Sequence, residues 1–173
     1  MSFMTPLRLR AATVADIQLL WEWVNDPVTR QMSFASKTIP WAEHCSWLHA
    51  RLADPTSLLF VASTAAEIPV GQARYDLQGD GFLIDVSVDP AHRRQGIGSR
   101  IIAQASQEVF ARTSICAIYA YIKPFNKASL RAFRRAGFLE DGEDMVQGQQ
   151  ARRLVLRRAE ASSSTDLLPG DSQ

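Results

Sequence analysis

The stretch Leu83-Ile-Asp-Val-Ser-Val-Asp-Pro-Ala-His-Arg-Arg-Gln-Gly-Ile-Gly-Ser-Arg100 decides the fold of this chain. Residues 82–88 are rich in β-branched and aromatic side chains, which is typical of a strand. Asp89-Pro90 ends that strand, because proline has no N–H to donate to a ladder and fixes its own φ. Beyond the basic loop that follows, apolar residues recur every four positions and predict a helix. They are Ile97, Ile101, Ala105 and Val109.

Two glycines, Gly96 and Gly98, stand at the start of that helix close to Arg93 and Arg94. The first turn of a helix leaves N–H groups without intrahelical partners, and the helix dipole adds partial positive charge there. Glycine lets a phosphate approach the backbone and arginine adds full charge, so the stretch predicts a pyrophosphate cradle. A plain strand–helix connection with solvated arginines is the alternative. The spacing matches neither the Gly-x-x-x-x-Gly-Lys-Ser/Thr loop nor the three-glycine dinucleotide fingerprint.

The loop does match the pattern Arg/Gln-x-x-Gly-x-Gly/Ala, and a second segment, Asn126-Lys-Ala-Ser-Leu-Arg-Ala-Phe-Arg-Arg-Ala-Gly-Phe138, follows it downstream. Together they resemble the acyl-CoA loop and the Asn-x-x-Ala/Ser…Gly-Phe segment of the GNAT superfamily of N-acyltransferases. The resemblance covers residues 6–158. It implies an α/β fold with a mixed, largely antiparallel twisted sheet, helices on both faces and a splayed central strand pair.

Composition and patterning favour one globular domain. The order of predicted elements is β-α-α-β-β-β-α-β-α-β, over a domain that spans residues 1–158. From Ala159 the composition shifts to Ser, Asp, Gly and Pro, which predicts a disordered tail over residues 159–173. The net charge of +1 gives no reason to expect nucleic acid or membrane as a partner. The two cysteines, Cys45 and Cys116, have no metal or redox spacing and are expected to be reduced and buried.

No run of apolar residues approaches membrane-spanning length, and residues 1–10 lack a secretory apolar region. The cytoplasm is therefore the expected location, with a monomer or a homodimer as the expected state. No metal site is expected.

The resemblance implies acetyl-CoA as the cosubstrate. Backbone groups of Val86 and Val88 would pair with its pantetheine arm, and the amides of residues 95–99 would bind its pyrophosphate. Asn126 would bind the cofactor arm or the acceptor; an Asx-type N-cap of the following helix is its structural alternative, and both roles can hold together. The residues expected at the cofactor are Val86, Val88, Arg93, Arg94, Gln95, Gly96, Ile97, Gly98, Ser99 and Asn126, with Arg100 beside them.

Phe133 departs from the family pattern, because many members carry a tyrosine there as the acid that protonates the departing thiolate. Phenylalanine cannot donate a proton. A thiolate with a free pKa of about 8.5 needs little protonic help to leave. Ser129 or a water could also reach the sulfur, or a phenol could come from Tyr119 or Tyr121, of which Tyr121 is the preferred catalytic residue.

Asp85 is the best carboxylate for taking the proton of the attacking amine, because a carboxyl group in a partly closed cleft suits a general base. An aspartate on the outer face of a sheet is the structural alternative, and a water chain without a single base is a further possibility. The catalytic residues expected are thus Tyr121, Asp85 and Ser129.

The acceptor is expected on a polar strand face, under a roof formed by residues 25–36. Its candidate contacts are Gln72, Arg74, Asp76 and Asn25. Segments 23–27, 39–47, 71–76 and 120–126 look like those of amino-sugar N-acetyltransferases of nonulosonate pathways, which implies a nucleotide-linked amino sugar. A protein N-terminal acetyltransferase of the ribosomal-protein type and a non-catalytic acyl-CoA-binding domain are the alternatives.

Overall fold

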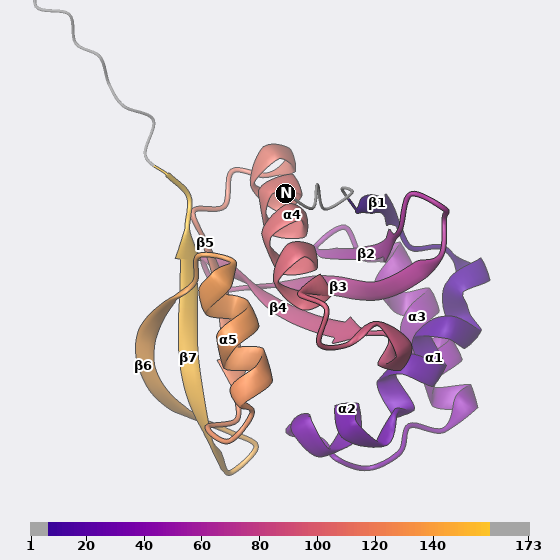
Figure 1. The fold of residues 1–173 in the computed structure, drawn as a ribbon, viewed down its shortest axis with the longest axis horizontal. Coiled ribbons are helices and arrows are strands. Elements are labelled where there is room, and N and C mark those ends of the chain that lie inside the picture. The colour runs from indigo at the N-terminus through magenta and orange to yellow at the C-terminus, as the bar shows by residue number, and fades with distance from the viewer. Residues whose placement is uncertain (1–6, 160–173) are drawn as a thin grey trace, which may run out of the picture.

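The structure is a computed structural model that describes residues 7–159. Its centre is a seven-stranded sheet with the strand order β1-β2-β3-β4-β5-β7-β6 (Figure 1). Neighbouring strands are antiparallel except β4 and β5, which run parallel. The strands are β1 (Arg8–Ala11), β2 (Ser57–Ser63), β3 (Pro69–Gln78), β4 (Gly81–Val88), β5 (Ala117–Ile122), β6 (Leu139–Val146) and β7 (Gln149–Arg157). The expected mixed, largely antiparallel α/β sheet is confirmed.

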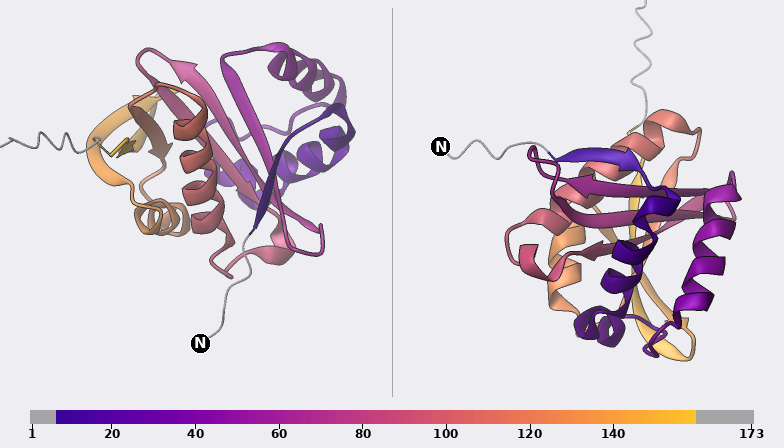
Figure 2. Two further views of the ribbon diagram at one scale, coloured as in Figure 1. Left: turned by 90° about the horizontal axis from the view of Figure 1, so that it is seen from above. Right: turned by 90° about the vertical axis from the view of Figure 1, so that its right-hand side faces the viewer.

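Helices cover both faces of the sheet. The α-helices are α1 (Ile17–Asn25), α2 (Pro27–Met32), α3 (Trp41–Ala53), α4 (Ile97–Arg112) and α5 (Lys127–Arg135), with short 3₁₀ turns at η1 (Val14–Asp16) and η2 (Pro90–His92). Seen along the sheet, α4 and α5 lie on one side and α1 and α3 on the other (Figure 2). The larger core lies under α4 and α5, and a smaller one lies under α1 and α3.

The predicted apolar stripe of α4 is confirmed, because its four members are all buried against the sheet. Burying a stripe of this kind is the main source of stability for a helix, since its own hydrogen bonds add little in water. The stripe therefore fixes how α4 is rotated and aims its first turn at the end of β4.

Two elements were not expected from the sequence. None of the residues of α2 is buried, and its sequence therefore lacks the apolar periodicity that predicts a helix. The helix forms because Asp26 caps it and Pro27 is its first residue. The side chain of Asp26 accepts a hydrogen bond from the Thr29 N–H at 3.0 Å. The strand β6 has the acid-rich sequence LEDGEDMV and forms the edge of the sheet, where polar residues are usual.

The expectation of two buried cysteines is wrong for Cys116, which is exposed, while Cys45 is half-buried on α3. Residues 160–173 of the expected tail lie outside the described residues. Within residues 7–159, no helix is both long enough and apolar enough to cross a membrane.

Candidate active site

The two parallel strands at the centre of the sheet separate after a very short paired region. β4 and β5 pair only at Phe82 with Ile118 and at Leu83 with Tyr119, although both strands continue beyond these positions. We call the opening beyond the Leu83–Tyr119 pair the β4–β5 gap. The expected splayed central pair is thus present, and the sheet is interrupted next to the start of α4.

Backbone groups on β4 face this gap. The N–H of Asp89 donates to the carbonyl of Val70 on β3 at 2.9 Å. Because backbone groups point to alternate edges along a strand, those of Val86 and Val88 are directed to the other edge, toward β5. They are the groups that an extended ligand in the gap would meet. The carbonyl of Val88 already accepts a hydrogen bond from Arg93 Nε at 3.3 Å.

The first turn of α4 is open to a ligand. Gly96 is its N-cap with φ of 73°, a left-handed conformation that favours glycine, and within residues 7–159 no side chain caps the helix. The Ser99 hydroxyl donates to the Gly96 carbonyl at 2.9 Å, so it does not occupy a first-turn N–H. The amides of Ile97 and Gly98 therefore remain available, as an anion cradle requires.

Gly98 marks the point where β4, α4 and α5 converge. A Cβ atom added there would lie 3.4 Å from Val88 Cγ2 and 3.8 Å from Ala132 Cβ. These are ordinary contact distances, so the glycine keeps the passage between the two helices free without being required by the fold. The start of α4, the end of β4 beside the gap and the facing side of α5 therefore adjoin one another at Gly98.

The guanidinium of Arg93, which was expected at the cofactor, is held by other residues of the protein. Its Nη2 atom contacts Asp26 Oδ2 at 2.6 Å and Thr29 Oγ1 at 3.2 Å. Burial alone would raise the pKa of Asp26, but the hydrogen bond from Arg93 and the Thr29 N–H lower it below its usual value. Arg93 therefore ties the loop to α2. Arg94, with φ of 63°, is exposed and forms no hydrogen bond or ion pair within residues 7–159.

The second expected motif forms the start of α5. Asn126 is the N-cap, and its Oδ1 accepts a hydrogen bond from the Ser129 N–H at 3.1 Å, as the structural alternative predicted. Ser129 is half-buried in the first turn. Phe133 is 5% exposed and packs edge-on against Phe138 with 5.0 Å between ring centroids, so it belongs to the core.

The remaining expected residues share the face of the sheet opposite α4 and α5, which we call the polar face. The register pairs Gln72 with Ser87 and Arg74 with Asp85 across β3 and β4. The members of the polar face are Gln72, Arg74, Asp76, Asp85, Ser87, Tyr119 and Tyr121. The residues that alternate with them, such as Ala73 and Ala120, are buried in the core under α4.

Asp85 and Tyr121 occupy equivalent positions on the two sides of the gap. Each lies two residues beyond the last paired position, Asp85 after Leu83 and Tyr121 after Tyr119. Because side chains two apart on a strand point to the same face, both project from the polar face at the gap. Tyr119 lies in the closed part of the sheet. The structure therefore distinguishes the two phenols and favours Tyr121.

Asp85 accepts a hydrogen bond from Gln72, which also contacts Ser87. Gln72 Nε2 donates to Asp85 Oδ2 and to Ser87 Oγ, both at 3.3 Å. Gln72 is only 7% exposed, so it supports the carboxylate from below and is poorly placed to contact an acceptor. Burial lowers the pKa of Arg30 on α2, and the negative charge of Asp85 acts against that change, so α2 faces Asp85 across the polar face.

Arg74 and Asp76 belong to a cluster of charged side chains. Asp76 accepts hydrogen bonds from Arg74 Nε at 2.8 Å and from Ser57 Oγ at 2.9 Å, and it lies 3.0 Å from Arg51 Nη1. These partners make Asp76 a structural anchor. The Arg74 guanidinium lies over the Trp47 ring at 5.2 Å, and within residues 7–159 its Nη atoms form no hydrogen bond.

Asn25 has a structural role in the folded chain, and its contact with the acceptor stays a prediction. Its Nδ2 donates to the Ile39 carbonyl at 3.0 Å, and its Oδ1 accepts from the Ile39 N–H at 2.8 Å. Both ends of the amide are therefore used to close the segment between α1 and α3.

That segment bridges the open end of the gap. Lys123, 7% exposed, donates from Nζ to the Gln31 carbonyl at 3.1 Å and lies near the rings of Phe34 and Phe125. Gln149 Nε2 donates to the Phe34 carbonyl at 2.7 Å. Together with the contact between Arg93 and Asp26, these bonds hold α2 to both halves of the sheet, as its position beside the β6–β7 hairpin shows (Figure 1).

A pocket of about 380 Å³ begins at Tyr121 and was not expected from the sequence. Arg153 on β7 lies opposite Tyr121, and its Nε is 2.9 Å from Asp141 Oδ2. The charge of Asp141 and then the Tyr121 hydroxyl raise the pKa of Arg153. The pocket is lined by Gln78, Asp80, Leu83, Tyr119, Tyr121, Asp141, Arg153 and Arg157. The pairing of β5 with β4 and with β7, together with that of β7 with β6, brings these residues together.

The family of the chain follows from its central region. The acetyltransferase (GNAT) family model matches residues 18–138, which contain the cradle, both strands of the gap and α5. This chain belongs to the GNAT acetyltransferase family. The expectations of an acyl-CoA-dependent N-acetyltransferase and of acetyl-CoA as its cosubstrate are confirmed. None of the curated proteins compared with this GNAT acetyltransferase matches its sequence.

Solved structures share the fold of this GNAT acetyltransferase. The aminoglycoside acetyltransferase AAC(6')-Ib, in complex with coenzyme A and kanamycin, is 20% identical with a TM-score of 0.76, covering 88% of this chain and 95% of that chain. The spermidine N-acetyltransferase from Vibrio cholerae, in complex with CoA and spermine, is 17% identical with a TM-score of 0.77, covering 87% and 95%.

We expect Arg93→Ala and Arg94→Ala to separate stability from cofactor binding in this GNAT acetyltransferase. Removing the Arg93 guanidinium leaves Asp26 without its cationic partner and should lower the free energy of unfolding by about 1–3 kcal/mol. Arg94→Ala should leave the melting temperature unchanged and weaken acetyl-CoA binding by about tenfold. Thermal unfolding and calorimetry measure both effects. An Arg93→Ala protein of native stability that no longer binds acetyl-CoA would reverse the assignment.

Proposed function

We propose that this enzyme transfers the acetyl group of acetyl-CoA directly to a primary amine, and that the amine belongs to a nucleotide-linked amino sugar. The observation that carries the transfer is the placement of Asp85 and Tyr121 at equivalent positions on one face of the β4–β5 gap. The observation that carries the acceptor class is the fixed Arg74 guanidinium on the same face.

Acetyl-CoA supplies the acetyl group as an activated thioester. The amides of Ile97 to Ser99 and the charge of Arg94 would hold its pyrophosphate, and the edge of β4 at Val86 and Val88 would pair with its pantetheine arm. The Oδ1 of Asn126 is already used to cap α5. Its Nδ2 is therefore the group left to bind the arm.

Asp85 would take the proton that the amine must lose before or during attack, directly or through a water. Gln72 holds the carboxylate from the β3 side, which limits its rotation. Tyr121 would hold a proton on the other side of the gap, where the leaving thiolate forms, and Ser129 at the start of α5 is a second donor. Direct transfer is favoured because Cys45 lies on α3 and Cys116 precedes the closed end of β5.

The charges of the polar face suit an anionic acceptor better than a polycation. The Asp76 carboxylate is already bound by Arg51 and Arg74, and Asp141 is bound by Arg153. Asp85 and Asp80 have no ion pair within residues 7–159, but Asp85 is assigned to the reacting amine, so a polyamine or an aminoglycoside would find only Asp80 as a further unpaired carboxylate here. A nucleotide sugar brings a diphosphate, and the Nη edge of Arg74 can bind phosphate oxygens with charge-assisted hydrogen bonds.

The variant Arg74→Ala tests the acceptor class. For a UDP-linked amino sugar we expect KM to rise by about tenfold or more, since a charge-assisted hydrogen bond is lost. Acetyl-CoA affinity should not change. Arg8→Ala is the matched control, because Arg8 also holds a carboxylate, Glu67, but lies on β1 at the far edge of the sheet. Unchanged KM in Arg74→Ala, or efficient turnover of an N-terminal peptide with none of the sugar, would overturn the substrate assignment.

A further inference from the structure

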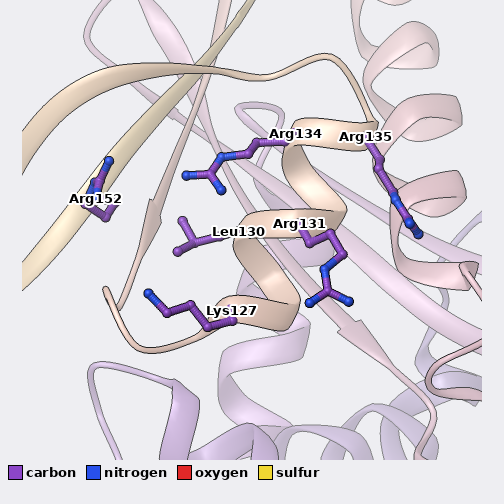
Figure 3. A pocket seen from close by; sticks show the side chains of 6 residues that line it. All are labelled: Lys127, Leu130, Arg131, Arg134, Arg135 and Arg152. Atoms are coloured by element: carbon purple, nitrogen blue, oxygen red, sulfur yellow. The ribbon is translucent and has the colours of Figure 1, made fainter.

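A second pocket, of about 510 Å³, lies on the α5 side of the sheet and is lined almost entirely by cations (Figure 3). Its lining residues are Lys127, Leu130, Arg131, Arg134, Arg135 and Arg152. Arg152 pairs with Ile122 on β5, whereas Arg153 pairs with Tyr121, so the two arginines lie on opposite faces of the sheet. The sheet therefore separates this pocket from the polar face and from the proposed acceptor.

The positive charge of this pocket is largely uncompensated. Glu140 contacts both Arg134 and Arg152. Within residues 7–159, no carboxylate pairs with Lys127, Arg131 or Arg135. The Nε atom of Arg152 is buried and has no hydrogen-bond acceptor among the described residues. A buried donor without an acceptor is rare in proteins, and it adds an unsatisfied donor beside the cations of the pocket.

Only part of this charge suits the helix that carries it, since Arg134 and Arg135 lie in its last turn, where the dipole favours cations. Lys127, Arg131 and Arg135 follow one another at steps of four, so like charges are neighbours on α5. Lys127 is the first residue of the helix, where the helix dipole disfavours a cation. α5 has no acidic residue that would offset these repulsions. A bound anion would offset them.

We propose that this pocket binds a phosphate monoester carried by a nucleotide-sized molecule. A phosphate monoester bears nearly two negative charges at neutral pH and offers several acceptor oxygens to guanidinium groups. The pocket volume falls within the range usual for small-molecule sites. Leu130 also lines the pocket but is only 3% exposed, so the organic part of the ligand would pack mainly on the aliphatic stems of the basic side chains.

The phosphate has two possible sources. Arg135 projects toward α4 (Figure 3), and Ala132 on α5 lies beside Gly98 at the cradle. The 3′-phosphate of CoA bound between the two helices can therefore reach the cations, or a separate nucleotide can occupy the pocket. Both sources present the same chemistry to Arg131, and affinity measurements distinguish them.

The variant Arg131→Glu provides a sharp test. It turns two like-charge pairs on α5 into opposite-charge pairs with Lys127 and Arg135, so its melting temperature should equal or exceed that of the native protein. Phosphate binding should nevertheless be lost. Arg157→Glu is the matched control, because it makes the same change of net charge on the other face of β7.

Calorimetry on the full chain has two arms. The first compares CoA with 3′-dephospho-CoA, and the second titrates adenosine 3′-monophosphate into protein saturated with 3′-dephospho-CoA. An advantage of CoA of about tenfold, lost in Arg131→Glu and kept in Arg157→Glu, supports the proposal with CoA as the source. Binding of adenosine 3′-monophosphate that is lost in Arg131→Glu and kept in Arg157→Glu supports the proposal with a separate nucleotide as the ligand. Equal affinity for CoA and 3′-dephospho-CoA together with no uptake of the monophosphate would overturn it, as would identical behaviour of the two variants.

Discussion

Gly98→Glu should abolish acetyl-CoA binding without unfolding the protein. The new carboxylate would enter the passage between Val88 and Ala132 and face the pyrophosphate. Two like charges about 4 Å apart at an effective dielectric constant of about 20 repel by roughly 4 kcal/mol. This energy corresponds to a loss of affinity of about a thousandfold. Calorimetric titration with acetyl-CoA measures it directly.

The fold should tolerate this substitution, because an added Cβ meets only ordinary contacts and an acidic residue in the first turn is favourable for the helix. Gly98→Gln is the matched control: it fills the same space without the charge and should lose much less affinity. Native affinity in a folded Gly98→Glu protein would show that the start of α4 is not the pyrophosphate site.

Tyr121→Phe should lower kcat by about a hundredfold, the lower end of what a general acid contributes. Phe133 is buried in the core and cannot donate a proton, whereas Tyr121 lies two residues beyond the last paired position at the gap. Acetyl-CoA affinity should be unchanged, because the tyrosine lies on the face opposite the cradle. Steady-state kinetics and calorimetry separate the two quantities.

Tyr119→Phe is the control for this loss, because it removes the same hydroxyl two residues earlier on β5, where the strands are still paired. It should leave kcat nearly unchanged. Ser129→Ala should cost less than Tyr121→Phe. If Tyr121→Phe, Ser129→Ala and their double variant all keep native kcat, the leaving thiolate needs no acid from the protein.

The cofactor half of the site could be predicted from the sequence because its determinants are local. The loop around Gly96 and the stripe of α4 are set by neighbours in the chain, and Asn126 caps α5 through a contact three residues away. Such short-range signals need no knowledge of the tertiary structure.

The acceptor half could be predicted only in part because it depends on contacts between distant segments. Asn25 was expected at the acceptor, but in the folded chain its amide binds Ile39, and Arg93 of the cofactor loop likewise binds the distant Asp26. The pocket at Tyr121 needs Arg153, which arrives through the pairing of β5 with β7. The acid-rich sequence of β6 does not predict a strand, so the β6–β7 hairpin that carries Arg153 could not be expected from the sequence.

A thiol-release assay over several classes of amine, with the product identified by mass spectrometry, tests the central claim most directly. The acceptors are a UDP-linked amino sugar, an N-terminal peptide, spermidine and kanamycin, each with acetyl-CoA. We expect release of CoA together with an N-acetylated sugar nucleotide, and much slower reaction with the other three amines. Acetylation of the peptide or of the polycations with none of the sugar nucleotide would contradict the acceptor assignment. Tight binding of acetyl-CoA with no transfer to any amine would contradict the proposed acetyl transfer.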